Sequence, residues 1–173
     1  MKIKPLVIGN LTAPIPVMQG GMGVGISLSG LAGAVAAEGG IGILSAAQIG
    51  YRDADYDNDP IACNLRAIKT EVAKARELAK GGIIGINIMV ATKRYEEYVK
   101  AAVEAGVDLI VSGAGLPMNL PELVQNAKTK LVPIVSSVKS LHVIVKYWMK
   151  KYTRIPDAVV WRVAACDPNW DGF

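Results

Sequence analysis

Glycine-rich and small polar segments follow several short apolar runs of this sequence, and their residue types could do chemistry. These segments are residues 19–23, 87–89, 112–115 and 136–137. Glycines let a ligand approach backbone amides closely, and an asparagine side chain can both donate and accept a hydrogen bond. Such a set could hold a flat heteroaromatic ring by its polar edges. It offers no obvious acid or base, so the sequence identifies no catalytic residue.

The common motifs of phosphate and metal sites are not satisfied. A dinucleotide-binding G-x-G-x-x-G motif that starts at Gly21 would need a third glycine where the chain has Ile26, and there is no Walker A sequence. The only two cysteines, Cys63 and Cys166, match neither a metal-site spacing nor a disulfide framework. We therefore expect no metal, and the cysteine usage indicates a reducing, cytoplasmic setting.

Apolar runs alternate with helix-like segments along the chain. The expected strands are residues 15–19, 41–44, 83–89, 108–111, 131–135 and 158–160. The expected helices are residues 28–38, 62–80, 94–105, 121–128 and 140–151. Apolar residues recur in the longer helical segments at about the helical period, and glycines end several of them. Ser27 or Ser29 could cap the first helix, and the polar residues 51–60 indicate a surface loop.

Strands that are apolar throughout, and that are joined by helices, indicate an α/β fold with a parallel sheet. Two architectures remain open, a doubly wound sheet and a closed barrel. A barrel of this kind usually has about 250 residues and eight units, so a chain with about six strands and about five helices would be an incomplete one. In both architectures ligands bind at the carboxyl ends of the strands, where the glycine and small polar segments lie.

Composition and charge exclude several broad classes of protein. The 173 residues are 51% hydrophobic, which is enough for one domain with a sizeable core. The net charge of +4 comes from scattered Lys and Arg residues, so nucleic-acid binding is not expected. No apolar run approaches the roughly 20 residues of a membrane span, and the first residues do not resemble a signal peptide. We expect a soluble protein that acts on a small molecule.

Six short segments carry a more specific signal through their order and spacing. They are residues 16–23 (PVMQGGMG), 31–35 (LAGAV), 38–42 (EGGIG), 85–89 (GINIM), 112–115 (SGAG) and 133–137 (PIVSS). Together they resemble the nitronate monooxygenases, formerly called 2-nitropropane dioxygenases. The related FMN-dependent enoyl-ACP reductases share the opening segments. The resemblance covers about residues 14–160.

The resemblance implies a TIM-type (β/α)8 barrel that holds FMN at the carboxyl ends of its strands. It implies that backbone atoms of residues 21–23 lie against the flavin, that Asn87 hydrogen-bonds FMN, and that the remaining positions border the same pocket. The implied cofactor-binding residues are Gly21, Met22, Gly23, Asn87, Gly113 and Ser136. Several of them have a structural alternative: each glycine as a plain tight turn, Asn87 as a turn or helix-cap residue, and Met22 as a core residue.

The activity implied by the resemblance is oxidation of alkyl nitronates with O2, with FMN carrying the chemistry. Reduction of an enoyl thioester with NAD(P)H and FMN is the nearest alternative, because those enzymes share the opening segments. A non-catalytic fragment or oligomeric binding protein without flavin is a second alternative. An open α/β sheet that binds another ligand is a third.

Residues 161–173 depart from the family pattern, which makes residues 1–160 the N-terminal part of the barrel and residues 161–173 an atypical tail. In the family, the sixth strand leads to a Glu-Gly segment and then to Ala-Gly-Gly-His, whose histidine is the expected base. The tail has no histidine and no Gly-Gly, and the only histidine, His142, is expected on a helix surface. Our hypothesis is a frameshift shortly after Val160, with a natural short variant or a deliberately shortened chain as alternatives.

An incomplete barrel would have energetic consequences. Its first and sixth strands would be unpaired edges, and apolar faces would lack the helices that cover them. We therefore expect poor solubility, association into homo-oligomers through exposed edges, or rescue by another chain. FMN affinity should also fall severely, because the family's phosphate-binding loops follow the later strands.

Overall fold

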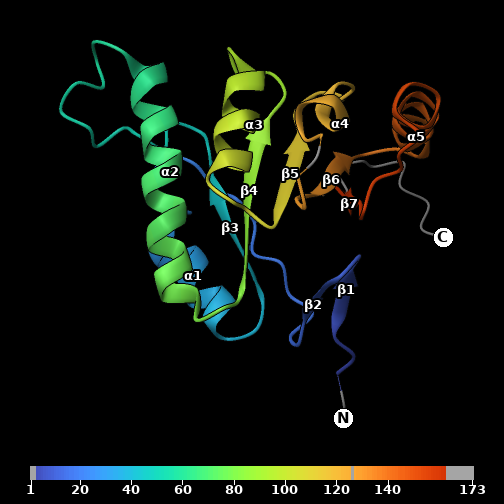
Figure 1. The fold of residues 1–173 in the computed structure, drawn as a ribbon, viewed down its shortest axis with the longest axis horizontal. Coiled ribbons are helices and arrows are strands. Elements are labelled where there is room, and N and C mark those ends of the chain that lie inside the picture. The colour runs from blue at the N-terminus through green and yellow to red at the C-terminus, as the bar shows by residue number, and fades with distance from the viewer. Residues whose placement is uncertain (1–2, 126, 163–173) are drawn as a thin grey trace, which may run out of the picture.

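The computed structural model describes residues 3–125 and 127–162 of an α/β protein built on one curled parallel sheet. The sheet contains five strands in sequence order: β3 (Ile41–Ser45), β4 (Ile83–Met89), β5 (Leu109–Gly113), β6 (Lys130–Val135) and β7 (Val160–Trp161). The helices are α1 (Ser29–Ala37), α2 (Pro60–Ala79), α3 (Tyr95–Glu104), α4 (Leu120–Leu123) and α5 (Val138–Tyr152). Each of the strands β3 to β6 is followed by a helix, and the next strand in sequence pairs beside it. This is the progression of a barrel rather than of a doubly wound sheet (Figure 1).

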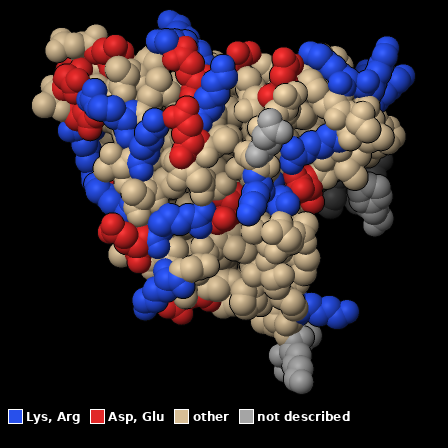
Figure 2. All heavy atoms as spheres, viewed as in Figure 1, with Lys and Arg blue, Asp and Glu red and all other residues tan. Residues whose placement is uncertain are grey.

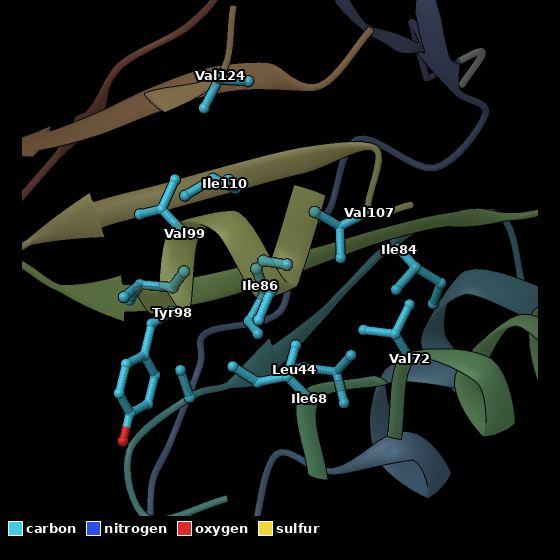
Figure 3. Close-up of a cluster of buried hydrophobic side chains, with 14 of the residues drawn as sticks. Leu44, Ile68, Val72, Ile84, Ile86, Tyr98, Val99, Val107, Ile110 and Val124 are labelled. Carbon is cyan, nitrogen blue, oxygen red and sulfur yellow. The ribbon is translucent and has the colours of Figure 1, made fainter. Parts of the chain in front are cut away.

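Both faces of the sheet are buried, each in its own cluster of apolar side chains. On the outer face, Leu44, Ile86 and Ile110 pack with Ile68 of α2 and Val99 of α3 (Figure 3). The side chains of the other face point into the hollow of the curl. They form a second cluster that contains Ile41, Ile43, Leu109, Val111 and Val132. The described part of the chain is therefore a partial TIM barrel with an inner and an outer core.

A short hairpin covers the inner cluster at the end of the partial barrel where the strands begin. It consists of β1 (Leu6–Ile8) and β2 (Leu11–Ala13), which pair antiparallel, and it lies below the sheet in Figure 1. Ile8 and Ala13 are buried in the inner cluster. The sequence analysis missed this hairpin because its strands have only three residues each. A local signal was present, since Gly9-Asn10 is a typical two-residue hairpin turn and Gly9 has φ +60°.

The first expected barrel strand, residues 15–19, is reduced to an isolated parallel bridge between Met18 and Ile41. Backbone hydrogen bonds still attach the segment to β3, from Gln19 N to Ile41 O at 3.0 Å and from Ile41 N to Val17 O at 2.8 Å. The N–H of Val17 donates to Ile15 O at 2.7 Å within the segment itself, so it does not extend the pairing with β3. The barrel therefore begins with a hydrogen-bonded segment that is not a regular strand.

Three details of the expected helices are wrong. The helix expected at residues 121–128 is the single turn α4, because Val124 already leaves the helical conformation. α5 begins at Val138 rather than Ser140, with Ser137 as its cap. Neither Ser27 nor Ser29 caps α1, whose N-cap residue is Leu28 and has no side-chain cap bond.

Two aspartates fasten strands at the end opposite the small polar segments. The Asp108 carboxylate accepts a hydrogen bond from Ile84 N of β4 at 2.8 Å and pairs with Arg76 at 2.7 Å. Asp157 repeats the arrangement before β7, because it accepts from Leu131 N of β6 at 2.8 Å and pairs with Arg154 at 3.2 Å. Each aspartate ties the beginning of one strand to its neighbour, which holds the strands in register.

The outer surface carries charges of both signs. Figure 2 shows Lys and Arg interspersed with Asp and Glu over the visible face. Among the helices of the described residues, none is long and apolar enough to cross a membrane. Of residues 161–173, which we expected to be an atypical tail, Trp161 lies in β7 and pairs with Val135, and residues 163–173 fall outside the described residues.

Candidate functional site

A loop of residues 20–27 lies at the carboxyl ends of β3 and β4 and is held there by two side chains. The amide of Gln19 donates to Gly20 O at 2.6 Å and to the Ser27 hydroxyl at 2.7 Å, and it accepts from Ile43 N of β3 at 3.1 Å. The Ser27 hydroxyl accepts from Met22 N at 2.9 Å, and Ser27 is only 1% exposed. Ser27, which we expected at a helix cap, therefore organises the glycine loop.

The glycines of this loop lie directly against the ends of the strands. A Cβ atom added at Gly21 would lie 2.6 Å from Cβ of Asn87, and one added at Gly23 would lie 2.9 Å from Cβ of Ala47. Both distances are shorter than Cβ contacts tolerate, so the approach of the loop to the sheet depends on these glycines. Met22 between them is 59% exposed, so its alternative assignment to the core is wrong.

Asn87 lies inside β4, where its Cα atom pairs with those of Ser45 in β3 and Val111 in β5. It is therefore neither a turn residue nor a helix cap. Within the described residues its side-chain amide makes no hydrogen bond, whereas the Gln19 amide is fully engaged. Ser45, which the sequence analysis placed beyond its strand, is a buried neighbour of Asn87.

A pocket of about 190 Å³ opens beside Asn87 on the inner side of the curled sheet. The loop residues Gly20 and Gly21 form one wall of it. The other walls are mainly apolar and come from Met18, Ile43, Val111, Ile134 and Val160. The free amide of Asn87 is thus the available polar group on an otherwise apolar surface, an arrangement that suits the polar edge of a flat ring.

A second pocket of about 260 Å³ lies at the carboxyl ends of β5, β6 and β7. Its lining residues are Ala114, Gly115, Leu116, Ile134, Val135, Ser136, Ser140 and Arg162. Ile134 lines both pockets and so forms a wall between them. Each pocket is smaller than the roughly 300 Å³ at which small-molecule sites usually begin, so a ligand of cofactor size would need space from both.

The second pocket is shaped by contacts that the sequence analysis did not find. The indole N–H of the fully buried Trp148 in α5 donates to Pro117 O at 3.1 Å, which fastens the loop after β5. Ser137 and Ser140 form a reciprocal capping box at the start of α5. The loop after β5 also contains Ala114 at φ +54° and Gly115 at φ +134°.

The six predicted cofactor-binding positions fall into two groups. Gly21 and Asn87 contact each other at the first pocket, and Ser136 lines the second. Gly113 lies between them, because a Cβ atom added there would lie 2.9 Å from Cβ of Ile134, the shared wall. Met22 and Gly23 belong to the loop but line neither pocket. All six therefore lie at the carboxyl ends of β3–β6 and the loop above them.

The electrostatics of the two pockets are simple. Among the described residues, Arg162 is the only charged residue in their linings, and no aspartate, glutamate or histidine lines either one. His142 is an exposed residue of α5, as the sequence predicts. Burial raises the pKa of Tyr95 to about 12. Its hydroxyl makes a buried hydrogen bond with Ser112, and neither residue lines either pocket. The described linings of the two pockets thus contain one cationic residue.

A separate group of possible metal ligands contains Asp53, Asp55 and Cys63, and it lies outside the pockets. The guanidinium of Arg66 donates to Asp53 at 3.0 Å and to Asp55 at 2.7 Å, and its hydrogen bond lowers the pKa of Asp55. Burial raises the pKa of the Cys63 thiol. Arg66 therefore supplies the positive charge that balances these carboxylates. Cys166 falls outside the described residues.

The residues present fit a flavin ring. The glycine wall brings backbone amides close to the pocket, the Asn87 amide can both donate and accept, and Val111 and Ile134 provide apolar contact. A Cβ atom at Gly21 would fill the space over Asn87 and remove this arrangement.

Comparisons with known proteins agree with this geometry. Residues 4–162 match the model of the family described as nitronate monooxygenase. The fold is similar to FabK from Thermotoga maritima, with a TM-score of 0.60 and 23% identity over 76% of this chain and 37% of that one. It is also similar to nitroalkane oxidase from Streptomyces ansochromogenes, with a TM-score of 0.61 and 17% identity over 78% of this chain and 44% of that one. The chain thus spans less than half the length of these structures, and no curated protein matches it.

Proposed function

Because the chain belongs to the nitronate monooxygenase family, we propose that it forms the flavin-ring side of an FMN-dependent oxidoreductase that oxidises alkyl nitronates with O2. The observation that carries this proposal is the close approach of Gly21 to Asn87 in the lining of the first pocket, the one of about 190 Å³. This contact places the glycine backbone of the loop next to the Asn87 side-chain amide, which makes no hydrogen bond to any described residue.

In this proposal FMN, when bound, supplies the electron-transfer chemistry, and the protein binds and orients. Asn87 would hold the polar edge of the ring through its amide. The loop backbone at Gly21 would lie beside the ring, and Gln19 and Ser27 keep that loop in place. Val111 and Ile134 would exclude water from the apolar part of the site.

A flavin titration followed by turnover tests the proposal. The purified 173-residue chain is titrated with FMN while the flavin absorbance and fluorescence are recorded. Because the family's phosphate-binding loops follow the later strands, we expect a low affinity, with a shifted absorbance spectrum and quenched fluorescence only at high protein concentration, and O2 consumption with propyl-1-nitronate once FMN is bound. A flavin spectrum identical to that of free FMN at every protein concentration would contradict the proposal for this chain and favour a non-catalytic fragment.

Enoyl thioester reduction is the enzymatic alternative, because the segment at residues 16–23 resembles both groups of enzymes. It is distinguished by the second substrate. The FMN-loaded chain is mixed without O2 with NADPH and an enoyl thioester, and NADPH oxidation is followed at its absorbance maximum. Thioester-dependent NADPH oxidation, together with no O2 consumption on nitronate, would replace our proposal by this alternative.

A further inference from the structure

Arg162 lies at the edge of the second pocket, directly after β7. Its backbone N–H donates to Val135 O at 2.8 Å, so the residue is held at the end of the sheet. Arg162 is an exposed residue and lines the pocket together with Ser136, Ser140 and Gly115. The pocket adjoins the Asn87 pocket across Ile134. A group bound at Arg162 would therefore lie next to the proposed flavin ring.

The surroundings of Arg162 offer donors and no competing negative charge. In the described ranges, Arg162 forms no ion pair and no carboxylate lines the pocket. Ser136 is exposed, and its hydroxyl makes no hydrogen bond to any described residue, whereas the hydroxyl of Ser140 is used in the capping box. The next charged residue in the first turn of α5 is Lys139, which is also positive. The pocket therefore favours a negatively charged ligand.

The shape of the donor group narrows the ligand class. A guanidinium presents two parallel N–H groups that match a planar group with two oxygens, as in a carboxylate. A nitronate has the same planar pair of oxygens and the same single negative charge. The thioester of an enoyl substrate has neither feature at its reacting end.

We propose that Arg162, assisted by Ser136, binds the anionic end of the substrate, and that the site takes small planar monoanions with two oxygens. The proposal rests on the proposed function for its substrate class, but not on flavin binding. Arg162 is a substrate-binding residue in this account. It determines specificity by favouring the nitronate over its neutral nitroalkane.

Anion binding to the flavin-free chain tests this directly. The ¹⁵N-labelled chain is titrated at pH 8 with propyl-1-nitronate, with acetate as a second planar anion and with 1-nitropropane as the neutral counterpart, at constant ionic strength. We expect both anions to shift the NMR signals of the Gly115 and Ser136 amides and of the Arg162 side-chain N–H. The neutral nitropropane should leave these signals unchanged.

Two substitutions and a charge-matched control complete the experiment. Arg162→Gln should weaken anion binding about tenfold or more, and Arg162→Lys several-fold, because lysine keeps the charge but loses the two parallel donors. Lys146→Gln removes the same charge from an exposed position of α5 that lines neither pocket, and it should change affinity by less than about twofold.

The proposal is overturned if Arg162→Gln binds the anions as tightly as Lys146→Gln does, or if nitropropane produces the same shifts as the nitronate. If Arg162→Gln does not fold, Arg162→Lys decides, since unchanged affinity would overturn the proposal and a several-fold loss would support it. The titration contains no flavin. A chain that binds the anions but not FMN would therefore refute the proposed function and leave this site standing.

Discussion

At Gly21 the lack of a side chain decides whether the glycine loop can lie against β4. The position that a Cβ atom would take is 2.6 Å from Cβ of Asn87, and both atoms belong to fixed backbone units rather than to the flexible end of a long side chain. Relief of such a contact requires the loop to move away from the sheet. Because Gln19 and Ser27 anchor the loop on both sides of Gly21, the movement would also strain their hydrogen bonds.

We predict that Gly21→Ala weakens FMN binding at least about tenfold, because the displaced loop no longer forms the wall over Asn87. The measurement is a fluorescence titration with FMN. Gly30→Ala is the matched control, since a Cβ atom at Gly30 meets nothing within 4 Å and Gly30 lines neither pocket. Equal FMN affinities for the two variants would mean that the loop does not contact the flavin.

At the scale of elements, α1 is capped by a residue of another helix. Its first amide, Ser29 N, donates at 2.9 Å to the Glu71 carboxylate of α2, which lies 42 residues later in the chain. A carboxylate at a helix N-terminus satisfies an unpaired amide and interacts favourably with the helix dipole. Burial acts to raise the pKa of Glu71, but the hydrogen bonds from Ser29 and Lys74 outweigh it, and the pKa is lowered below 4.5.

We predict that Glu71→Gln lowers the free energy of unfolding at pH 7 by about 0.5–2 kcal/mol, the usual range for loss of a helix cap. Because the folded-state pKa is depressed, the charged form stabilises the fold above the unfolded-state pKa. This contribution is lost as the pH falls through the lowered folded-state value. Urea denaturation at a series of pH values should therefore show a difference between wild type and variant that shrinks below pH 4.5.

The control for this prediction is Glu77→Gln, an exposed glutamate of the same helix that makes no ion pair among the described residues. This substitution removes the same charge without removing a cap. The free energy of unfolding of the variant should therefore stay within about 0.5 kcal/mol of wild type across the same series of pH values. A loss of equal size in the two variants would assign the effect to net charge and not to the contact with α1.

At the scale of the whole molecule, the partial barrel exposes apolar residues along the two outer edges of its sheet, at the segment before β3 and at β7. Ile15 and Val17 on the first segment are 44% and 53% exposed, and Val159 and Trp161 at the other end are 36% and 42% exposed. Beside Ile15 and Val17 runs an apolar groove of about 350 Å³ that also includes Ala34. In a closed barrel such edges would be covered by neighbouring strands and helices.

We predict that the isolated chain self-associates through these edges in a concentration-dependent manner. Light scattering after size-exclusion chromatography should give a mass above the 18.3 kDa of the monomer. Val17→Lys should shift the mass towards the monomer. Val7→Lys, at a 60% exposed position of the β1–β2 hairpin, should not. A monomer at every concentration would show that the open edges do not associate.

Many features of the fold were predictable because they depend on local patterns. The apolar runs at residues 83–89 and 131–135 correspond to β4 and β6 with little change in their bounds. The helical period of residues 62–80 corresponds to α2. The parallel sheet followed from the alternation of strands and helices, whereas the sequential strand order, which distinguishes a barrel from a doubly wound sheet, came from the structure. The short segments near Gly9 and Val124 were misjudged, because few residues carry little periodic signal.

The amino-acid sequence by itself determined that small and glycine-rich segments follow successive parallel strands, and therefore that they meet at one end of the sheet. Only the tertiary structure decided how they meet. The contact of Gly21 with Asn87, the cap from Glu71 to α1 and the place of Arg162 beside Ser136 join residues far apart in the chain. Hydrophobic period and turn chemistry act over a few neighbouring residues, whereas these contacts depend on the curl of the sheet and on how the helices pack against it.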